Sequence, residues 1–176
     1  MKTVLRWLSI LPALFILLLI FNFSAQDGSA SGSLSYKVSY TLISVMNRLF
    51  SMNLPKTELS SRADAIHLIV RKLAHMSEYF ALTLSIYLPL RIWLPYKGIL
   101  ISGKYFFSRL ILPSFFLSLL CAAADEFHQS FVPGRCGTPV DVGIDSIGIL
   151  ASCIFLMLCK HHINKKRNRH SLSVNS

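Results

Sequence analysis

Acidic residues are scarce in this sequence: 8 Asp and Glu stand against 18 Lys and Arg in 176 residues, for a formal net charge of +10. The basic residues flank apolar runs, and no basic motif with interleaved aromatic residues is present, so we expect no nucleic-acid partner. Charged residues of both signs make up only 15% of the chain, whereas 53% is hydrophobic. This composition excludes an ordinary soluble domain and is typical of an integral membrane protein.

Paired cysteine motifs are also absent. The four cysteines show no CxxC spacing, and three of them lie in apolar runs, where cysteine usually behaves as a small buried hydrophobe. They are Cys121, Cys136, Cys153 and Cys159. The sequence therefore predicts neither a disulfide framework nor a structural zinc site.

Four segments are long and apolar enough to be membrane spans, because a bilayer core of about 30 Å needs roughly 20 helical residues. They lie at about 5–23, 73–94, 110–127 and 139–159. The first follows basic residues as a signal peptide does, but Phe23 is a poor −3 residue for cleavage at Ala25, so we favour a retained anchor. The sequence thus predicts an all-α polytopic membrane protein, with one membrane domain over residues 1–160.

The distribution of charge predicts the direction of the spans. With a cytoplasmic N-terminus, most basic residues fall on the cytoplasmic side, including Lys97 and Lys104 between the second and third spans. All acidic residues then fall on the outer side or in the outer ends of spans. The positive-inside rule therefore predicts a cell-membrane protein with both termini in the cytoplasm.

Two segments outside the spans have a recognisable character. Residues 27–33 read as a small-residue linker, and beyond it apolar residues recur at three- and four-residue steps: Leu34, Val38, Leu42, Val45, Leu49 and Met52. This stripe predicts an amphipathic helix lying in the outer membrane interface. Residues 161–176 form a basic tail, which we expect to anchor the topology near anionic lipid and to end in a disordered segment.

Polar residues draw a line down each of the last three predicted spans, because residues three and four apart share one face of a helix. The lines are Asp64, His67, Arg71, His75 and Glu78; Ser114, Ser118, Cys121, Asp125 and His128; and Asp141, Asp145, Gly148 and Ser152. A carboxylate near the bilayer centre costs about 2.5–3.5 kcal/mol, so such residues usually face a partner or water. The three lines predict a shared polar pocket at the outer face, with Gly148 and Ala151-Ser152 allowing close helix approach.

Two of these residues also have a purely structural interpretation. A Thr-Pro helix start precedes Asp141, so its carboxylate at the third helical position complements the helix dipole. That interpretation does not account for Asp145 one turn deeper. Arg135 follows a Pro-Gly pair that fits the centre of a type II turn, and its side chain alternatively extends to lipid headgroups.

The other polar residues differ in how well a structural role explains them. Arg71 and Lys72 flank a predicted span and are alternatively simple interface anchors. His75 and Glu78 alternatively form one structural pair. The adjacent acids at 125–126 are harder to explain in this way, because they point in different directions from a helix end and both need partners.

Three chemistries suit such a pocket. In the first, His75 or His128 is a general base or nucleophile that a carboxylate orients, while Arg135 holds an anionic group such as a phosphate. In the second, a divalent metal activates water or clamps a phosphate, although the spacing matches no recognised metal motif; its ligands would be His75, Glu78, Asp125, His128 and Asp145. In the third, the pocket binds a ligand or relays protons without cleavage.

The position of the pocket suggests what enters it. An amphipathic helix beside a polar site that opens to the lipid edge suits an amphiphile with an anionic head. Membrane lipids and a phosphorylated lipid or lipid-linked envelope precursor are therefore the expected partners. Four short spans without an inverted repeat rank transport below binding.

Four stretches resemble, in the same order, the motifs of the VanZ-like family of bacterial membrane proteins: FNFSAQDGSASGSLS, RKLAHMSEYFAL, DEFHQSFVPGR and DVGIDSIG. The match covers about residues 15–155. The positions that carry the resemblance are Ser24, Gln26, Lys72, His75, Glu78, Tyr79, Asp125, Glu126, Gln129, Arg135, Asp141, Asp145 and Gly148. The resemblance implies a multi-span cell-envelope protein, whose namesake is linked to reduced susceptibility to teicoplanin. A second glycine common after Gly148 in relatives is replaced here by Ala151-Ser152.

The sequence therefore predicts the following site. The candidate catalytic residues are His75, Glu78, Asp125, Glu126, Gln129, Asp141 and Asp145, and the candidate ligand-binding residues are Arg135, Lys72, Ser24 and Gln26. His75 would transfer protons, Arg135 would hold the anion, and the acids would orient groups or bind a divalent metal. One hypothesis is a membrane hydrolase or transferase acting on an anionic lipid-type substrate; the alternative is a non-catalytic scaffold whose polar network is structural.

Overall fold

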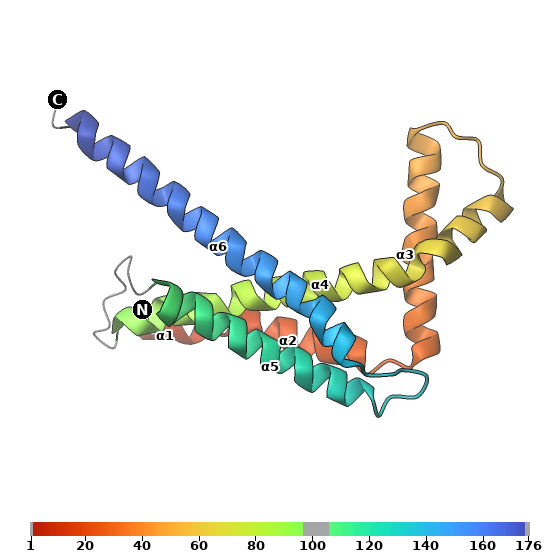
Figure 1. The fold of residues 1–176 in the computed structure, drawn as a ribbon, viewed down its shortest axis with the longest axis horizontal. Helices are drawn as coiled ribbons and strands as arrows, with labels where there is room; N and C mark the ends of the chain where they lie inside the picture. Colours follow the sequence, from red (N-terminus) through yellow and green to blue (C-terminus); the bar gives the residue numbers. More distant parts are fainter. Residues whose placement is uncertain (1, 97–105, 175–176) are drawn as a thin grey trace.

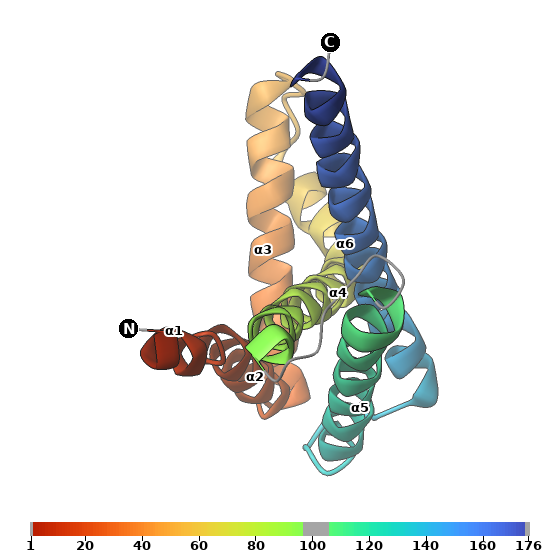
Figure 2. The same cartoon turned by 90° about the vertical axis from the view of Figure 1, so that its left-hand side faces the viewer.

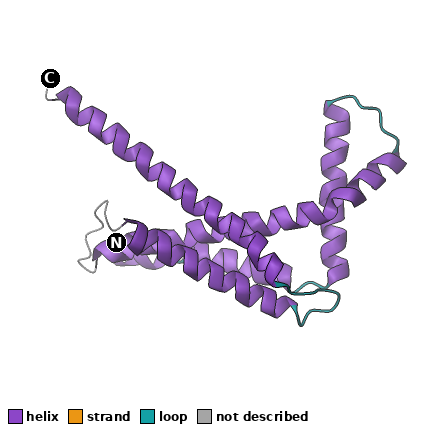
Figure 3. Cartoon of the chain, viewed as in Figure 1, coloured by secondary structure: helices purple, strands orange, loops and turns teal. Residues whose placement is uncertain are grey.

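The computed structural model describes residues 2–96 and 106–174. Every regular element in this part of the chain is a helix, which confirms the all-α prediction (Figure 3). In chain order the helices are α1 (Lys2–Leu8), α2 (Leu11–Ser24), α3 (Gly28–Leu49), α4 (Lys56–Tyr96), the short π-helix η2 (Phe107–Ile111), α5 (Leu112–Gln129) and α6 (Pro139–Val174).

Three segments of the described chain are long and apolar enough to cross a membrane: Arg6–Ser24, Phe107–Gln129 and Pro139–Lys166. They agree with the spans predicted at 5–23, 110–127 and 139–159. The span predicted at 73–94 lies inside α4 but is not among the three. Polar residues such as His75, Glu78 and Arg91 lower the hydropathy of that helix. The number of spans therefore stands at three by composition.

Helix α4 lies at the centre of the molecule. It packs against α2, α3, α5 and α6, and the end-on view places it between α2 and α3 on one side and α5 and α6 on the other (Figure 2). Its residues Tyr79, Leu82 and Thr83 are completely buried. Tyr79 and Leu82 form an apolar core with Ile20 of α2 and Ile149 of α6. A helix surrounded by protein in this way can have side chains that are less hydrophobic than those of a helix that faces lipid.

Close helix contact is possible because of Gly148. A Cβ atom at this position would collide with the backbone carbonyl of Met76 in α4. Ser152, one turn further along α6, is fully buried, whereas Ala151 is exposed. The predicted role of Gly148 in helix approach is therefore confirmed, and of the following pair only Ser152 lies in the interior.

Helix α3 runs across the direction of α2 and α4 (Figure 1). The linker predicted at 27–33 is wrong, because α3 already begins at Gly28. Asp27 caps it by accepting a hydrogen bond from the Ala30 amide at 2.7 Å. The hydrogen bond from the Ser29 hydroxyl, with that of Ala30, lowers the pKa of Asp27. These hydrogen bonds thus stabilise the first turn of α3.

The predicted amphipathic helix is present, and its apolar stripe is exposed. Leu34, Val38, Leu42 and Val45 are each close to half exposed, while Ser35 and Ser39 are the buried residues of α3. The small serine side chains allow α3 to pack on α4. Met52, the last residue of the predicted stripe, lies beyond the end of the helix.

The basic tail is helical as far as Val174, where we expected a disordered segment, and residues 175–176 lie outside the described residues. Helix α6 continues through the basic segment to Val174, well beyond the predicted limit at residue 159. No glycine or proline follows Gly148 in this helix, so no strong breaker ends it. Lys97 and Lys104, which the topology prediction used, lie outside the described residues.

Candidate functional site

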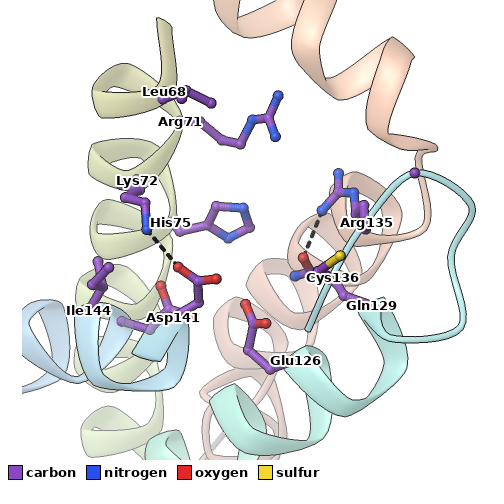
Figure 4. Close-up of a pocket in the computed structure, with 12 residues that line it drawn as sticks. Leu68, Arg71, Lys72, His75, Glu126, Gln129, Arg135, Cys136, Asp141 and Ile144 are labelled. Atoms are coloured by element: carbon purple, nitrogen blue, oxygen red, sulfur yellow. Dashed lines mark hydrogen bonds and ion pairs between the residues drawn. The ribbon is translucent and has the colours of Figure 1, made fainter. Parts of the chain in front are cut away.

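The predicted polar residues meet where three helix ends surround α4. One face of α4, the C-terminal end of α5, the first turns of α6 and the 130–138 loop line a cavity of about 180 Å³ (Figure 4). Seven of the predicted site residues line it, namely Lys72, His75, Glu126, Gln129, Arg135, Asp141 and Asp145. The structure therefore brings together residues from three of the sequence motifs.

The 130–138 loop is folded by a tight turn that directs Arg135 inward. Gly134 has a φ of +71°, and the Arg135 amide donates to the Val132 carbonyl at 3.1 Å, as expected for the predicted turn. The loop is also joined to the start of α3, because the Gly28 amide donates to the Pro133 carbonyl at 3.0 Å. A Cβ at Gly28 would collide with the Gly134 carbonyl, so the two chain segments touch here.

Arg135 is held by protein groups rather than extended into solvent. One of its terminal nitrogens donates to Gln129 Oε1 at 3.0 Å, and the other donates to the Phe23 carbonyl at 2.8 Å. These bonds connect the loop to the ends of α5 and α2. Burial and the nearby positive charge of Arg71 lower the pKa of Arg135.

Asp125 is the centre of a buried hydrogen-bonded network. Its Oδ2 accepts from the Ser24 hydroxyl at 2.8 Å and from Gln129 Nε2 at 2.9 Å. Gln129 Nε2 also lies 3.1 Å from the Ser24 hydroxyl oxygen. Ser24 and Asp125 are 101 residues apart in the chain, so this network joins the ends of α2 and α5. Ser24 and Asp125 do not line the cavity, but they bond to Gln129, which does.

Glu126 and Asp141 both secure the start of α6. Glu126 Oε2 accepts from the Thr138 amide at 3.1 Å. The Thr138 hydroxyl donates to Asp141 Oδ2 at 2.9 Å and accepts from the Asp141 amide at 3.2 Å, as expected of an N-cap threonine. The other carboxylate oxygen of Asp141 pairs with Lys72 of α4 at 2.7 Å. The helix-cap interpretation of Asp141 is therefore confirmed, and the same residue also links two helices.

Two arginines in the cavity have no carboxylate partner among the described residues. Lys72 pairs with Asp141, and His75 Nδ1 lies 3.6 Å from Glu78 Oε2. By contrast, Arg135 donates only to neutral oxygens, and the buried Nε atoms of Arg71 and Arg135 have no hydrogen-bond partner. Arg71 and His75 project from α4 toward Arg135 on the opposite wall (Figure 4). The positive charge of this part of the cavity is thus not neutralised by direct ion pairs.

A second cavity of about 200 Å³ adjoins the first between α2, α3 and α4. The predicted residues Gln26 and Glu78 line it, and so do apolar residues such as Leu34, Val38 and Val70. Arg71, His75 and Arg135 line both cavities. These three side chains therefore stand at the boundary between a polar and a largely apolar compartment.

The metal hypothesis receives no support from this geometry. Within residues 2–96 and 106–174, no three His, Cys, Asp or Glu side chains are grouped closely enough to hold a metal ion. His128, one of the predicted ligands, stacks on Phe21 of α2 with ring centroids 4.7 Å apart. His128, the last residue of the polar line on α5, therefore lines neither cavity, whereas His75 lines both.

Sequence reasoning placed Arg71 on the right face of the helix but left it out of the site. Its position four residues before His75 was the available signal. Cys136 and Gly134 also line the polar cavity. They belong to an irregular loop, and no periodic pattern could have assigned them.

The helices that build the site, α2 to α6, make up most of the chain. A family model described as VanZ/LLP1 matches residues 9–160. The chain belongs to the VanZ/LLP1 family. No curated protein and no solved structure matches it. The match spans α2 to α6 and contains every residue of both cavities, so VanZ family membership confirms the resemblance found in the motifs and makes the chain a VanZ-like protein of the cell envelope.

Proposed function

We propose that this VanZ-family protein binds, and acts on, an anionic lipid-linked or cell-wall-related ligand at the outer face of the cell membrane. The observation that carries the proposal is the pair Arg71 and Arg135, two guanidinium groups that share a cavity and have no carboxylate partner among the described residues. Planar guanidinium groups match phosphate and carboxylate oxygens, and a ligand anion would satisfy them.

The proposal includes a fourth span, formed by α4. Thr83, in the middle of this helix, is fully buried and donates to the Ser118 hydroxyl of α5 at 3.0 Å. A central helix of this kind can cross a bilayer at a lower hydropathy, because its polar groups bond to protein and do not meet lipid. The excess of basic residues on one side favours an orientation with both termini in the cytoplasm and the cavity on the outer side.

The side chains divide the chemistry between them. Arg135, with Arg71, holds the anion, and the Lys72–Asp141 ion pair lines the same cavity. His75 stands between the two cavities and is the group best placed to move a proton, with Glu78 3.6 Å away to orient its ring. Asp145 is buried beside the cavity, and its Oδ2 has no hydrogen-bond partner among the described residues. This arrangement suits a hydrolase or transferase.

A second candidate is a non-catalytic scaffold, and one observation favours it. Asp125 and Glu126 are already satisfied by Ser24, Gln129 and the Thr138 amide. Fully bonded buried acids stabilise a fixed arrangement of helices and need no ligand. In this alternative the network positions a partner protein or shields a precursor.

Teicoplanin susceptibility of a bacterial host tests the proposal. The host would express the wild type, His75→Ala, Arg71→Gln or the control His67→Ala, with membrane levels matched by immunoblot. His67 is on the same helix, but its Nδ1 contacts only the Asp64 carbonyl and it lines neither cavity. We expect the wild type and His67→Ala to reduce susceptibility and the two cavity variants to lose this effect.

The contrary results separate the two candidates. Cavity variants that accumulate normally and protect as well as the wild type would refute the ligand-binding role. Variants that fail to accumulate would instead support the structural network. A wild type that gives no protection would remove the link to teicoplanin.

A further inference from the structure

The apolar cavity beside the candidate site is the starting point, and the inference rests on the proposed function. This cavity has a volume of about 200 Å³, and its walls are largely apolar. For comparison, an apolar cavity of roughly 150 Å³ can hold a benzene ring. The space therefore fits part of a hydrocarbon chain but not a whole lipid.

The cavity continues onto an exposed apolar surface. Leu34 and Val38 of α3 line it and are 44% and 49% exposed. Leu42 extends the same stripe away from the cavity and is 49% exposed. A chain that leaves the cavity along α3 would therefore remain in contact with apolar side chains, and outside them with the membrane in which this family resides.

The polar end of the same cavity is cationic. Arg71, His75 and Arg135 form the boundary with the polar cavity, and neither arginine has a carboxylate partner among the described residues. Arg71 also lies against α3, since a Cβ at Gly32 would be 3.3 Å from one of its terminal nitrogens. These three side chains therefore separate a polar cavity from an apolar one. An amphiphile with an anionic head has the complementary arrangement, a charged group joined to an apolar chain.

We propose that the ligand is a membrane phospho-amphiphile whose phosphate lies between Arg71 and Arg135 and whose hydrocarbon chain occupies the cavity between α3 and α4. The chain enters sideways from the lipid along the exposed face of α3. Leu34, Val38, Val70 and Ala74 contact it, and these residues decide whether a soluble phosphate or a lipid phosphate is bound.

The test compares two phosphate probes on the purified full-length protein in non-ionic detergent. Native mass spectrometry would measure retention of hexadecyl phosphate, and competition would measure binding of methyl phosphate, which has the same head and no chain. Val38→Trp fills the apolar cavity, and Val45→Trp is the matched control on the same face of α3, seven residues further along. Arg71→Gln removes the cation.

We expect the wild type and Val45→Trp to retain hexadecyl phosphate. Val38→Trp should lower its apparent affinity by about tenfold or more, and methyl phosphate should compete weakly. Arg71→Gln should lower the affinity by a similar factor, because a charge-assisted hydrogen bond is lost.

The outcomes distinguish this inference from the function on which it rests. If methyl phosphate binds as tightly as hexadecyl phosphate, or Val38→Trp binds like the wild type, the chain site is refuted and a free-phosphate site remains. If binding depends on Val38 but not on Arg71, the chain site stands and the anion-binding role falls. If the wild type retains neither probe, the inference is overturned, while the susceptibility assay remains an independent test of the proposed function.

Discussion

Gln129 has a central place in the site because it uses both ends of its amide. Its nitrogen donates to Asp125, while its oxygen accepts from Arg135. The same side chain therefore connects a buried acid to the loop arginine, and it keeps the two charged groups apart while bonding to both. A carboxylate at this position would serve only one of the two contacts.

Replacement of Gln129 by Glu tests that connection. The substitution keeps the shape of the side chain but removes the nitrogen donor and places a second acid against Asp125. We expect the free energy of unfolding to fall by about 1–3 kcal/mol, because Asp125 loses one of its two donors and faces a second buried acid. Thermal unfolding of the purified protein in detergent measures this change.

Ser130→Ala is the matched control for Gln129→Glu. Ser130 is adjacent but exposed, and its hydroxyl bonds only to the Phe127 carbonyl of the same helix. Its replacement should leave the unfolding temperature nearly unchanged. Equal stability of Gln129→Glu and the wild type would mean that the amide nitrogen has no important role.

At the level of helices, the contact between α4 and α6 determines the distance across the polar cavity. Lys72 and His75 come from α4, and Asp141 and Asp145 come from α6. The two backbones approach each other closely where Gly148 lies against Met76. The site is therefore built on a helix crossing that requires a residue without a side chain.

Two glycines of α6 should respond to alanine in opposite directions. Gly148→Ala forces the Met76 backbone away and should destabilise the protein by about 1–3 kcal/mol. Gly143→Ala meets no atom within 4 Å, and it should raise stability by roughly 0.5–1 kcal/mol because alanine favours a helix. Thermal unfolding of the two variants side by side measures both effects, and a Gly148→Ala protein as stable as Gly143→Ala would show that α4 and α6 do not need this approach.

For the whole molecule, the orientation in the membrane decides which compartment the cavity faces. The 130–138 loop, which lines the polar cavity, lies at one end of α5. Helix α6 extends from that end to the C-terminus (Figure 1). If the loop is outside, the distal part of α6 reaches the cytoplasm. The native cysteines provide reporters of this arrangement, because Cys136 is exposed in the loop and Cys159 lies farther along α6.

A membrane-impermeant maleimide tests the proposed orientation. In sealed spheroplasts we expect it to label the wild type at Cys136 and to leave Cys136→Ala unlabelled. After permeabilisation, Cys136→Ala should become labelled at Cys159, which is partly exposed. Labelling of Cys136→Ala in sealed spheroplasts would place α6 the other way round and would move the cavity to the cytoplasmic side.

The sequence by itself determined the features that depend on neighbouring residues. Hydropathy located the spans at 5–23, 110–127 and 139–159, since transfer of a helix to lipid depends on its own side chains. Helical periodicity placed His75 and Asp145 on inward faces, and the Pro-Gly pair predicted the turn before Arg135. The VanZ motifs indicated the family before any geometry was known.

Only the tertiary structure decided which side chains meet across helices. Ser24 with Asp125, Arg71 facing Arg135, and His128 stacked on Phe21 depend on the rotation and crossing of helices that are far apart in the chain. The same is true of α3, where the serine face is buried and the apolar face is exposed. Periodicity gives the face of one helix, but the partner of that face is fixed by close packing between helices, such as Gly148 against Met76, which no local pattern contains.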